Sequence, residues 1–228
     1  MSSMFRRLAL ATALSFSPMA MSPLLADVLV VRSSGPSAGN YPPGRRLADS
    51  TNLALLANDT LTILSRGGTR TFRGPGTVNV TGPIRVGPLA SAISERTNRR
   101  SRIGAVRGQE GERGLWDVNV TQPGTYCVRA GSRPSLWRAN AREAASLSVN
   151  AARVDWPAGR AFLRWPEGVA VVNGAQYDLS LSSGPAPATI RIVTIPSLPA
   201  DPVDIGELLY RNGCQPQFEH LLASLPPA

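Results

Sequence analysis

Turn-forming residues recur along almost the whole chain, and their spacing limits the lengths of its helices and strands. The 228 residues include 21 glycines and 20 prolines. Glycine permits positive φ angles and proline has no backbone N–H to donate, so both favour turns over long helices. Short runs in which side chains alternate with a period of two lie between the turns, as at Thr60 to Ser65. Turns at intervals of about 8 to 12 residues are typical of a β-sandwich or barrel.

Two β regions are expected, separated by a segment of different composition. The first, residues 27–90, begins with the apolar run Val28 to Val31, and its further strands are predicted at 52–56, 60–65, 69–73 and 77–81. Residues 91–114 contain six arginines, three glutamates and few large apolar side chains, which predicts a solvated linker. A basic docking segment for an anionic surface is the alternative. The second region, residues 115–200, is predicted to be sandwich-like, with strands at 116–121, 125–130, 146–149, 161–165, 169–172, 177–181 and 189–194.

The C-terminal residues 201–228 change to a helical period. Asp204 is the candidate N-cap of a first helix, with Glu207 three residues later and Gly213 as its stop. A second apolar face follows, made by Phe218, Leu221, Leu222 and Leu225. A short helix is also predicted near Asn140 to Ala145. The expected fold class is therefore mainly β, with two small β domains and a short C-terminal helical cap.

The N-terminal residues 1–26 have the pattern of a secretory signal peptide. Arg6 and Arg7 precede an apolar stretch that serines and prolines interrupt, and cleavage is best placed after Ala26. The interrupted stretch is a poor candidate for a spanning helix, so no integral membrane span is expected after cleavage. The mature protein is predicted to be periplasmic. Retention of the segment as an N-terminal anchor is the alternative.

The chain has two cysteines, Cys127 and Cys214. In an oxidising compartment two cysteines generally form one disulfide, and buried free thiols are the alternative. Closing a loop of nearly ninety residues stabilises a fold by about 4–5 kcal/mol in the chain-entropy description. If the pair forms, it ties the helical tail to the second β region.

The positive charge of the chain limits the classes of molecule that it is expected to bind. The formal net charge is +9, and all 24 basic residues are arginines that are scattered along the sequence. Nucleic-acid binding, which favours a basic stripe with interleaved aromatic residues, is not indicated in this exported chain. An envelope protein or an anionic envelope polymer, such as lipopolysaccharide or a wall polymer, is the expected partner.

The chain lacks the residues that several classes of enzyme need for catalysis. Without lysine there is no Schiff-base or Walker-type lysine, and a single histidine, His220, with two distant cysteines supplies a metal site poorly. No metal and no cofactor are expected.

The run Gly35 to Gly39 fits the G-x-S-x-G hydrolase motif around Ser37, with Asp201 or Asp204 and His220 as the remaining triad members. Pro42 and Pro43 exclude the helix that should follow such a serine, so a serine hydrolase is a remote alternative.

A short internal repeat contains two of the tryptophans. An apolar-x-Trp-Pro-x-Gly unit ends in Gly159 and recurs ending in Gly168, with Trp156 and Trp165 at equivalent positions and Arg164 beside the second. The functional interpretation is a sugar-binding site in which Trp156 and Trp165 stack on a glycan and Arg164 contributes charge. The structural interpretation, which the usual burial of tryptophan favours, is a pair of core residues at strand ends.

The stretch from Val28 to Val80 resembles the FecR-like β domain of bacterial envelope proteins. The residues that carry the resemblance are the opening strand, the turn Tyr41-Pro42-Pro43-Gly44 with Leu47, the step Asn58-Asp59-Thr60, and the run from Gly67-Gly68 to Gly74-Pro75-Gly76. The resemblance implies a β meander or barrel used for sensing or scaffolding. The chain lacks the cytoplasmic segment and membrane helix of the sigma-factor regulators in that family, so direct regulation of a sigma factor is not implied.

These observations predict a non-enzymatic interaction, scaffold or sensing-accessory module of the cell envelope. An envelope glycan-binding domain is the alternative from a different class.

Overall fold

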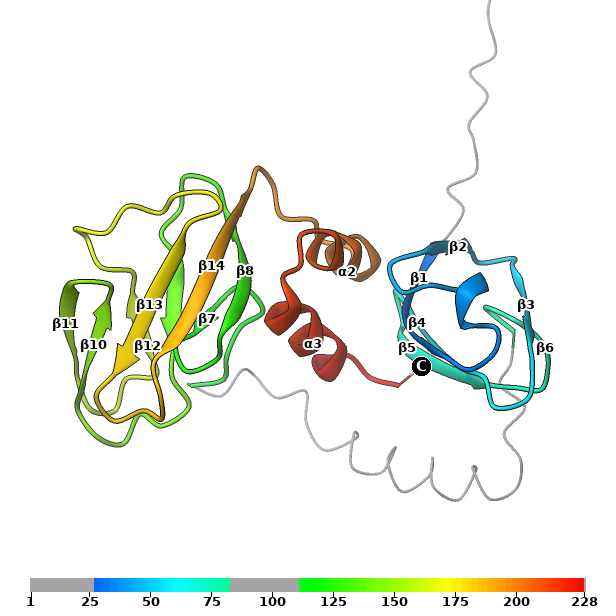
Figure 1. Cartoon of the computed structure of the whole chain (residues 1–228), viewed down its shortest axis with the longest axis horizontal. Helices are drawn as coiled ribbons and strands as arrows, with labels where there is room; N and C mark the ends of the chain where they lie inside the picture. The colour runs from blue at the N-terminus through cyan, green and yellow to red at the C-terminus, as the bar shows by residue number, and fades with distance from the viewer. Residues whose placement is uncertain (1–26, 83–110, 228) are drawn as a thin grey trace, which may run out of the picture.

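The computed structural model describes residues 27–82 and 111–227. The expected signal peptide and most of the expected linker therefore lie outside the described residues. Figure 1 shows two β units with a pair of helices between them. A mainly β fold with a helical C-terminus, as predicted, is confirmed.

The first β unit contains six short strands. An antiparallel sheet has the order β2 (Arg46–Ala48), β1 (Asp27–Ser34), β4 (Thr60–Ser65), β5 (Gly68–Arg73), and β3 (Asn52–Leu55) pairs with β6 (Gly76–Asn79). A 3-10 turn, η1 (Ala38–Asn40), follows β1. Neither sheet closes into a barrel within the described residues. The run Val28 to Val31 is buried on both faces, with Val28 and Val30 in the core of this unit and Leu29 and Val31 facing the helices.

The second β unit packs two sheets on one core. The larger sheet has the order β11 (Ala152–Trp156), β10 (Ala145–Val149), β13 (Gln176–Leu181), β14 (Ala188–Ile195), β8 (Gly124–Arg129), with only the β14–β8 pair parallel. The smaller sheet has the order β12 (Phe162–Arg164), β9 (Ser135–Trp137), β7 (Val118–Asn119). Their shared core includes Tyr126, Leu136, Leu147, Trp156 and Ile190. Both β11 and β12 are edge strands.

Two helices, α2 (Pro202–Arg211) and α3 (Gln215–Ser224), complete the fold. The N-cap of α2 is Asp201 and not Asp204, so that prediction is wrong. The Asp201 carboxylate accepts a hydrogen bond from the Val203 N–H at 2.9 Å, and Pro202 occupies the first helical position, where its missing N–H costs nothing. Asp204 instead binds a distant arginine. The predicted stop is confirmed, because Gly213 has a φ of 67° just beyond the helix end.

Three other local predictions differ from the structure. Residues 169–172 have an irregular backbone and do not form a strand. The Tyr177 hydroxyl accepts a hydrogen bond from the Val172 N–H and donates one to the Ala170 carbonyl, both at 2.8 Å. No helix forms at 140–145, where the Asn140 side chain accepts from the Arg142 N–H and β10 begins at Ala145. Strands β2, β9 and β11 were not predicted, because the first two have only three residues and β11 follows β10 across a two-residue turn.

Candidate functional site

The two tryptophans of the internal repeat are core residues. Trp156 is 0% exposed and Trp165 is 1% exposed. Each indole N–H donates to a backbone carbonyl four residues later, at 2.8 Å to Arg160 and 2.9 Å to Val169. Neither ring offers a free face to a sugar, so the stacking interpretation of this pair is contradicted and the structural interpretation holds.

Arg164, the third residue predicted for that site, is exposed and borders a groove. This edge groove has a volume of about 970 Å³ and opens beside the edge strands β11 and β12. The partly buried Val154 and Leu163 supply apolar walls. Charged side chains from the same region complete its lining: Arg133, Asp155, Arg160, Arg164 and Glu167. A groove of this size with apolar walls and convergent charges is a reasonable ligand site.

The lining of the edge groove carries three arginines and two acidic residues. Glu167 pairs with Arg133 at 3.2 Å, and no ion pair engages Arg160 or Arg164 within the described residues. The next aromatic side chain, Phe162, is 38% exposed and also lines the groove. The groove therefore offers arginines and one open aromatic ring to an anionic or extended ligand.

A buried arginine lies behind this groove. Arg138 is 1% exposed, and its guanidinium is 4.9 Å from the centre of the Trp156 ring. It donates to the carbonyls of Pro157 at 2.9 Å and Arg160 at 3.2 Å, and burial lowers its pKa. Its Nη1 is buried without a hydrogen-bond partner among the described residues. Arg138 thus fixes the loop between β11 and β12 and adds positive charge near the groove.

The residues of the predicted hydrolase triad are not brought together. Ser37 is buried, and its N–H donates to the Asp59 carboxylate at 2.9 Å. Burial acts to raise the pKa of Asp59, but hydrogen bonds from Ser37 and Leu56 outweigh it and lower that pKa. His220 contacts the Arg113 carbonyl at 3.0 Å, while Asp201 caps α2. The motif around Ser37 is a structural turn.

The helical clamp, defined as α2 and α3, joins the two β units through one apolar cluster. Leu29, Val31 and Leu64 come from the first unit, and Cys127 and Ile195 from the second. Between them lie the clamp residues Val203, Leu209, Cys214, Phe218 and Leu221. Gly206 allows close approach, because a Cβ there would lie 2.7 Å from Leu64 Cδ2. The helices therefore pack into both units at once.

The second unit is also tied covalently to the clamp. Cys127 of β8 and Cys214, the N-cap of α3, form the predicted disulfide, with their Cα atoms 5.7 Å apart. Beside it, Gln217 is 0% exposed. Its amide accepts from the Cys127 N–H at 2.6 Å and donates to the Cys127 carbonyl at 2.9 Å and the Leu115 carbonyl at 3.2 Å. This side chain thus satisfies backbone groups at the β8 edge as a neighbouring strand would.

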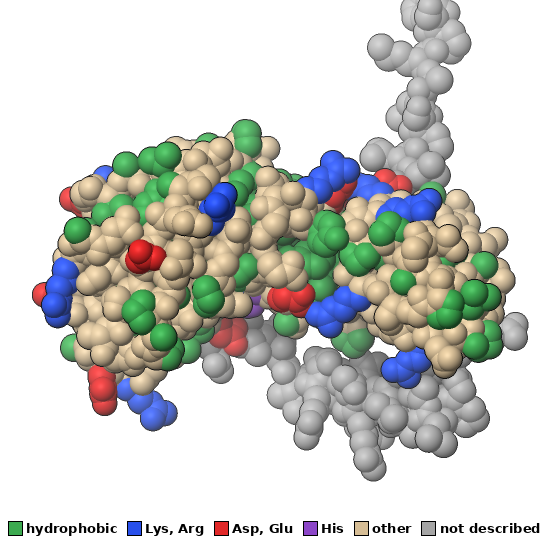
Figure 2. All heavy atoms as spheres, in the orientation of Figure 1, with side chains coloured by type: hydrophobic (Ala, Val, Ile, Leu, Met, Phe, Trp, Pro, Cys, Tyr) green, Lys and Arg blue, Asp and Glu red, His purple; other side chains and the backbone are tan. Residues whose placement is uncertain are grey.

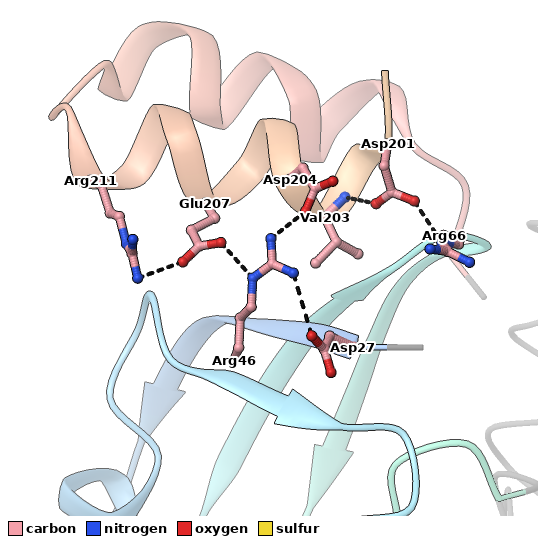
Figure 3. Close-up of polar contacts among 8 residues, drawn as sticks. All are labelled: Asp27, Arg46, Arg66, Asp201, Val203, Asp204, Glu207 and Arg211. Carbon is pink, nitrogen blue, oxygen red and sulfur yellow. Dashed lines mark hydrogen bonds and ion pairs between the residues drawn. The ribbon is translucent and has the colours of Figure 1, made fainter. Parts of the chain in front are cut away.

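Ion pairs tie the first unit to the clamp (Figure 3). Arg46 of β2 donates to Glu207 at 2.5 Å and to Asp204 of α2, and it contacts Asp27 at 3.5 Å. The hydrogen bonds to Asp204 and Glu207 raise the Arg46 pKa despite its partial burial. Arg32 of β1 also pairs with Glu219 of α3 at 2.5 Å. Figure 2 shows acidic and basic side chains together where the helices meet this unit.

Within residues 27–82 and 111–227, no group of three His, Cys, Asp or Glu side chains could hold a metal ion. In the same part of the chain, no helix has both the length and the apolar character needed to cross a bilayer. The chain matches no known family model, no curated protein and no solved structure.

The sequence predicted the disulfide, which is confirmed, and it singled out Arg164, which lines the edge groove; it did not point to several other residues described above. Arg133 is distant from Arg164 in the sequence, and Arg160 lies in the loop between β11 and β12. Only the fold brings both of them to the groove beside Arg164. The two Trp-Pro units were a usable signal, since Pro157 and Pro166 both line that groove. Gln217 carries no such signal, because a single glutamine in a helix has no periodicity of its own.

Proposed function

We propose that this protein is a non-enzymatic interaction or scaffold module of the bacterial cell envelope and acts in the periplasm. The observation that carries the proposal is the helical clamp. A scaffold must hold separate surfaces in a fixed relation, and the apolar cluster, the disulfide and the Arg46 ion pairs together link both β units to one helical pair. The disulfide also suits an oxidising compartment, and the N-terminal residues 1–26 suit export.

The edge groove is the surface on which we place the partner. Its arginine lining favours an acidic surface on an envelope protein, since complementary charge speeds association and orients the partner. The second candidate function, binding of an anionic envelope glycan, is favoured by the same arginines together with the exposed Phe162 ring. It no longer involves stacking on Trp156 and Trp165.

Crosslinking in intact cells, followed by affinity capture of the tagged protein and mass spectrometry, tests the proposal. We expect one protein partner that an unrelated periplasmic bait of similar charge does not capture. The matched variant Arg160→Gln with Arg164→Gln removes two groove charges without touching the core, and it should reduce that capture. Retention of lipopolysaccharide or wall material alone would favour the glycan candidate. A catalytic turnover lost on replacement of one side chain would exclude a non-enzymatic module.

A further inference from the structure

The two edges of the larger sheet in the second unit differ, because one is covered by a helix and the other is not. At the β8 edge, α3 packs on the strand and Gln217 occupies the outward N–H and C=O of Cys127. At the opposite edge, β11 has no strand beside it within the described residues. In Figure 1, β11 lies at the far end of the second unit, away from the helices. A free edge strand is a template for pairing with another chain.

The hydrogen-bond pattern identifies which backbone groups of β11 are free. Ser146 of β10 and Asn150, just after β10, bond to the β13 side: the Ser182 N–H donates to the Ser146 carbonyl at 2.9 Å, and the Asn150 N–H donates to the Asp178 carbonyl at 2.8 Å. The alternate residues of β10 therefore bond to β11, where they face Ala152, Val154 and Trp156. The N–H and C=O groups of Arg153 and Asp155 consequently point away from the sheet.

The side chains at these two positions carry opposite charge. Arg153 and Asp155 are both exposed, and Asp155 forms no ion pair within the described residues. Val154 lies between them and is only partly buried. The free edge therefore presents the sequence Arg-Val-Asp. When two copies of this edge run antiparallel, the arginine of each copy faces the aspartate of the other.

Only one antiparallel register suits two copies of this edge. Centring the pair on Val154 places Arg153 of each copy opposite Asp155 of the other, so both backbone pairs form with opposite charges facing each other. The next registers that keep the outward-facing groups paired differ by two residues. One of them places Arg153 opposite Arg153 of the other copy, and the other places Asp155 opposite Asp155. Like charges directly opposite destabilise strand pairing. Pro157 then ends the ladder, because it has no N–H to donate.

We propose that a second copy of this chain occupies the free edge of β11, giving a two-fold symmetric dimer with a ten-stranded sheet. An isologous contact of this kind is closed, so it does not continue into a fibre. Because β11 also borders the edge groove, through Val154 and Asp155, the second copy stands beside the groove of the first. The contact is short, and we expect a dissociation constant of about 0.1 mM, at the weak end of specific association.

Sedimentation equilibrium of the disulfide-bonded protein tests the dimer. The variants Arg153→Asp and Asp155→Arg each place like charges at both paired positions. Each variant alone should dissociate at least about tenfold more readily than the parent. An equimolar mixture of the two variants should regain the parent affinity, because the opposite charges then face each other again. Loss of folding cannot imitate recovery on mixing.

A further variant tests the backbone pairing separately. Asp155→Pro removes one outward N–H without touching a bond to β10, and it should weaken the dimer more than Asp155→Asn does. A parent protein that stays monomeric at about 1 mM would overturn the inference. So would single variants that dimerise as the parent does, or a mixture that fails to recover. None of these results bears on capture of an envelope partner, so the proposed function is tested separately.

Discussion

Replacing Gln217 by methionine should lower the stability of the protein by about 2–4 kcal/mol. Methionine keeps the length and unbranched shape of the side chain, so little packing is lost. It removes the three hydrogen bonds to Cys127 and Leu115. Since Gln217 is 0% exposed, water does not reach the abandoned groups easily. Each buried group left unpaired costs about 1–3 kcal/mol, and the added apolar burial offsets part of that sum.

Urea denaturation, followed by tryptophan fluorescence with the disulfide intact, measures this change. The control is Gln215→Met on the same helix, because Gln215 is exposed and, within the described residues, its side chain bonds to Glu219 alone. We expect the control to change the free energy of unfolding by no more than about 0.5 kcal/mol. Amide hydrogen exchange gives a local readout, and the Cys127 N–H should exchange faster in Gln217→Met. If the two variants are equally stable, the buried amide does not contribute as argued.

Three further predictions concern the clamp and the core. The double variant Cys127→Ser with Cys214→Ser should lose about 4–5 kcal/mol of unfolding free energy, since the disulfide closes a loop with a sequence separation of 87. A loss below about 1 kcal/mol would contradict the chain-entropy reasoning. The hydrogen bond from Arg66 lowers the pKa of Asp201, although burial acts to raise it. Its stabilisation is therefore present above about pH 4, the unfolded value, and is lost as pH falls through the folded pKa. Asp201→Asn keeps the cap on α2 but should reduce the drop in melting temperature between pH 7 and pH 3, and an unchanged drop would argue against this ion pair. Trp156→Ala should cost about 3–5 kcal/mol, whereas an unchanged stability on denaturation would argue against its core role.

The sequence predicted those parts of the fold whose causes are local. The alternation in Thr60 to Ser65 became β4 with the predicted bounds, because the period of two depends only on neighbouring side chains. The C-terminal helices followed from apolar spacing in the same way. The disulfide between Cys127 and Cys214 followed from having one possible pair.

The errors arose where a distant residue decides a local outcome. Asp204 was predicted as the N-cap of α2, but Asp201 takes that place, and Asp204 binds Arg46, which lies 158 residues earlier in the chain. Residues 169–172 have the composition of a strand, but their backbone is irregular, and the Tyr177 hydroxyl bonds to the Val172 N–H and the Ala170 carbonyl where a neighbouring strand would otherwise pair. The edge groove was only partly foreseen, through Arg164, because its arginines come from separate segments.

The buried arginine and the buried glutamine show how the second unit closes one edge and leaves the other open. Gln217 gives the β8 edge both a donor and an acceptor, and the disulfide keeps α3 in place over it. Near the other edge, Arg138 fixes the loop after β11 through backbone carbonyls, so the loop does not need a further strand to hold it. An open edge usually invites unspecific pairing. The opposite charges of Arg153 and Asp155 restrict that pairing to one register, and a free edge with one allowed register is a recognition surface.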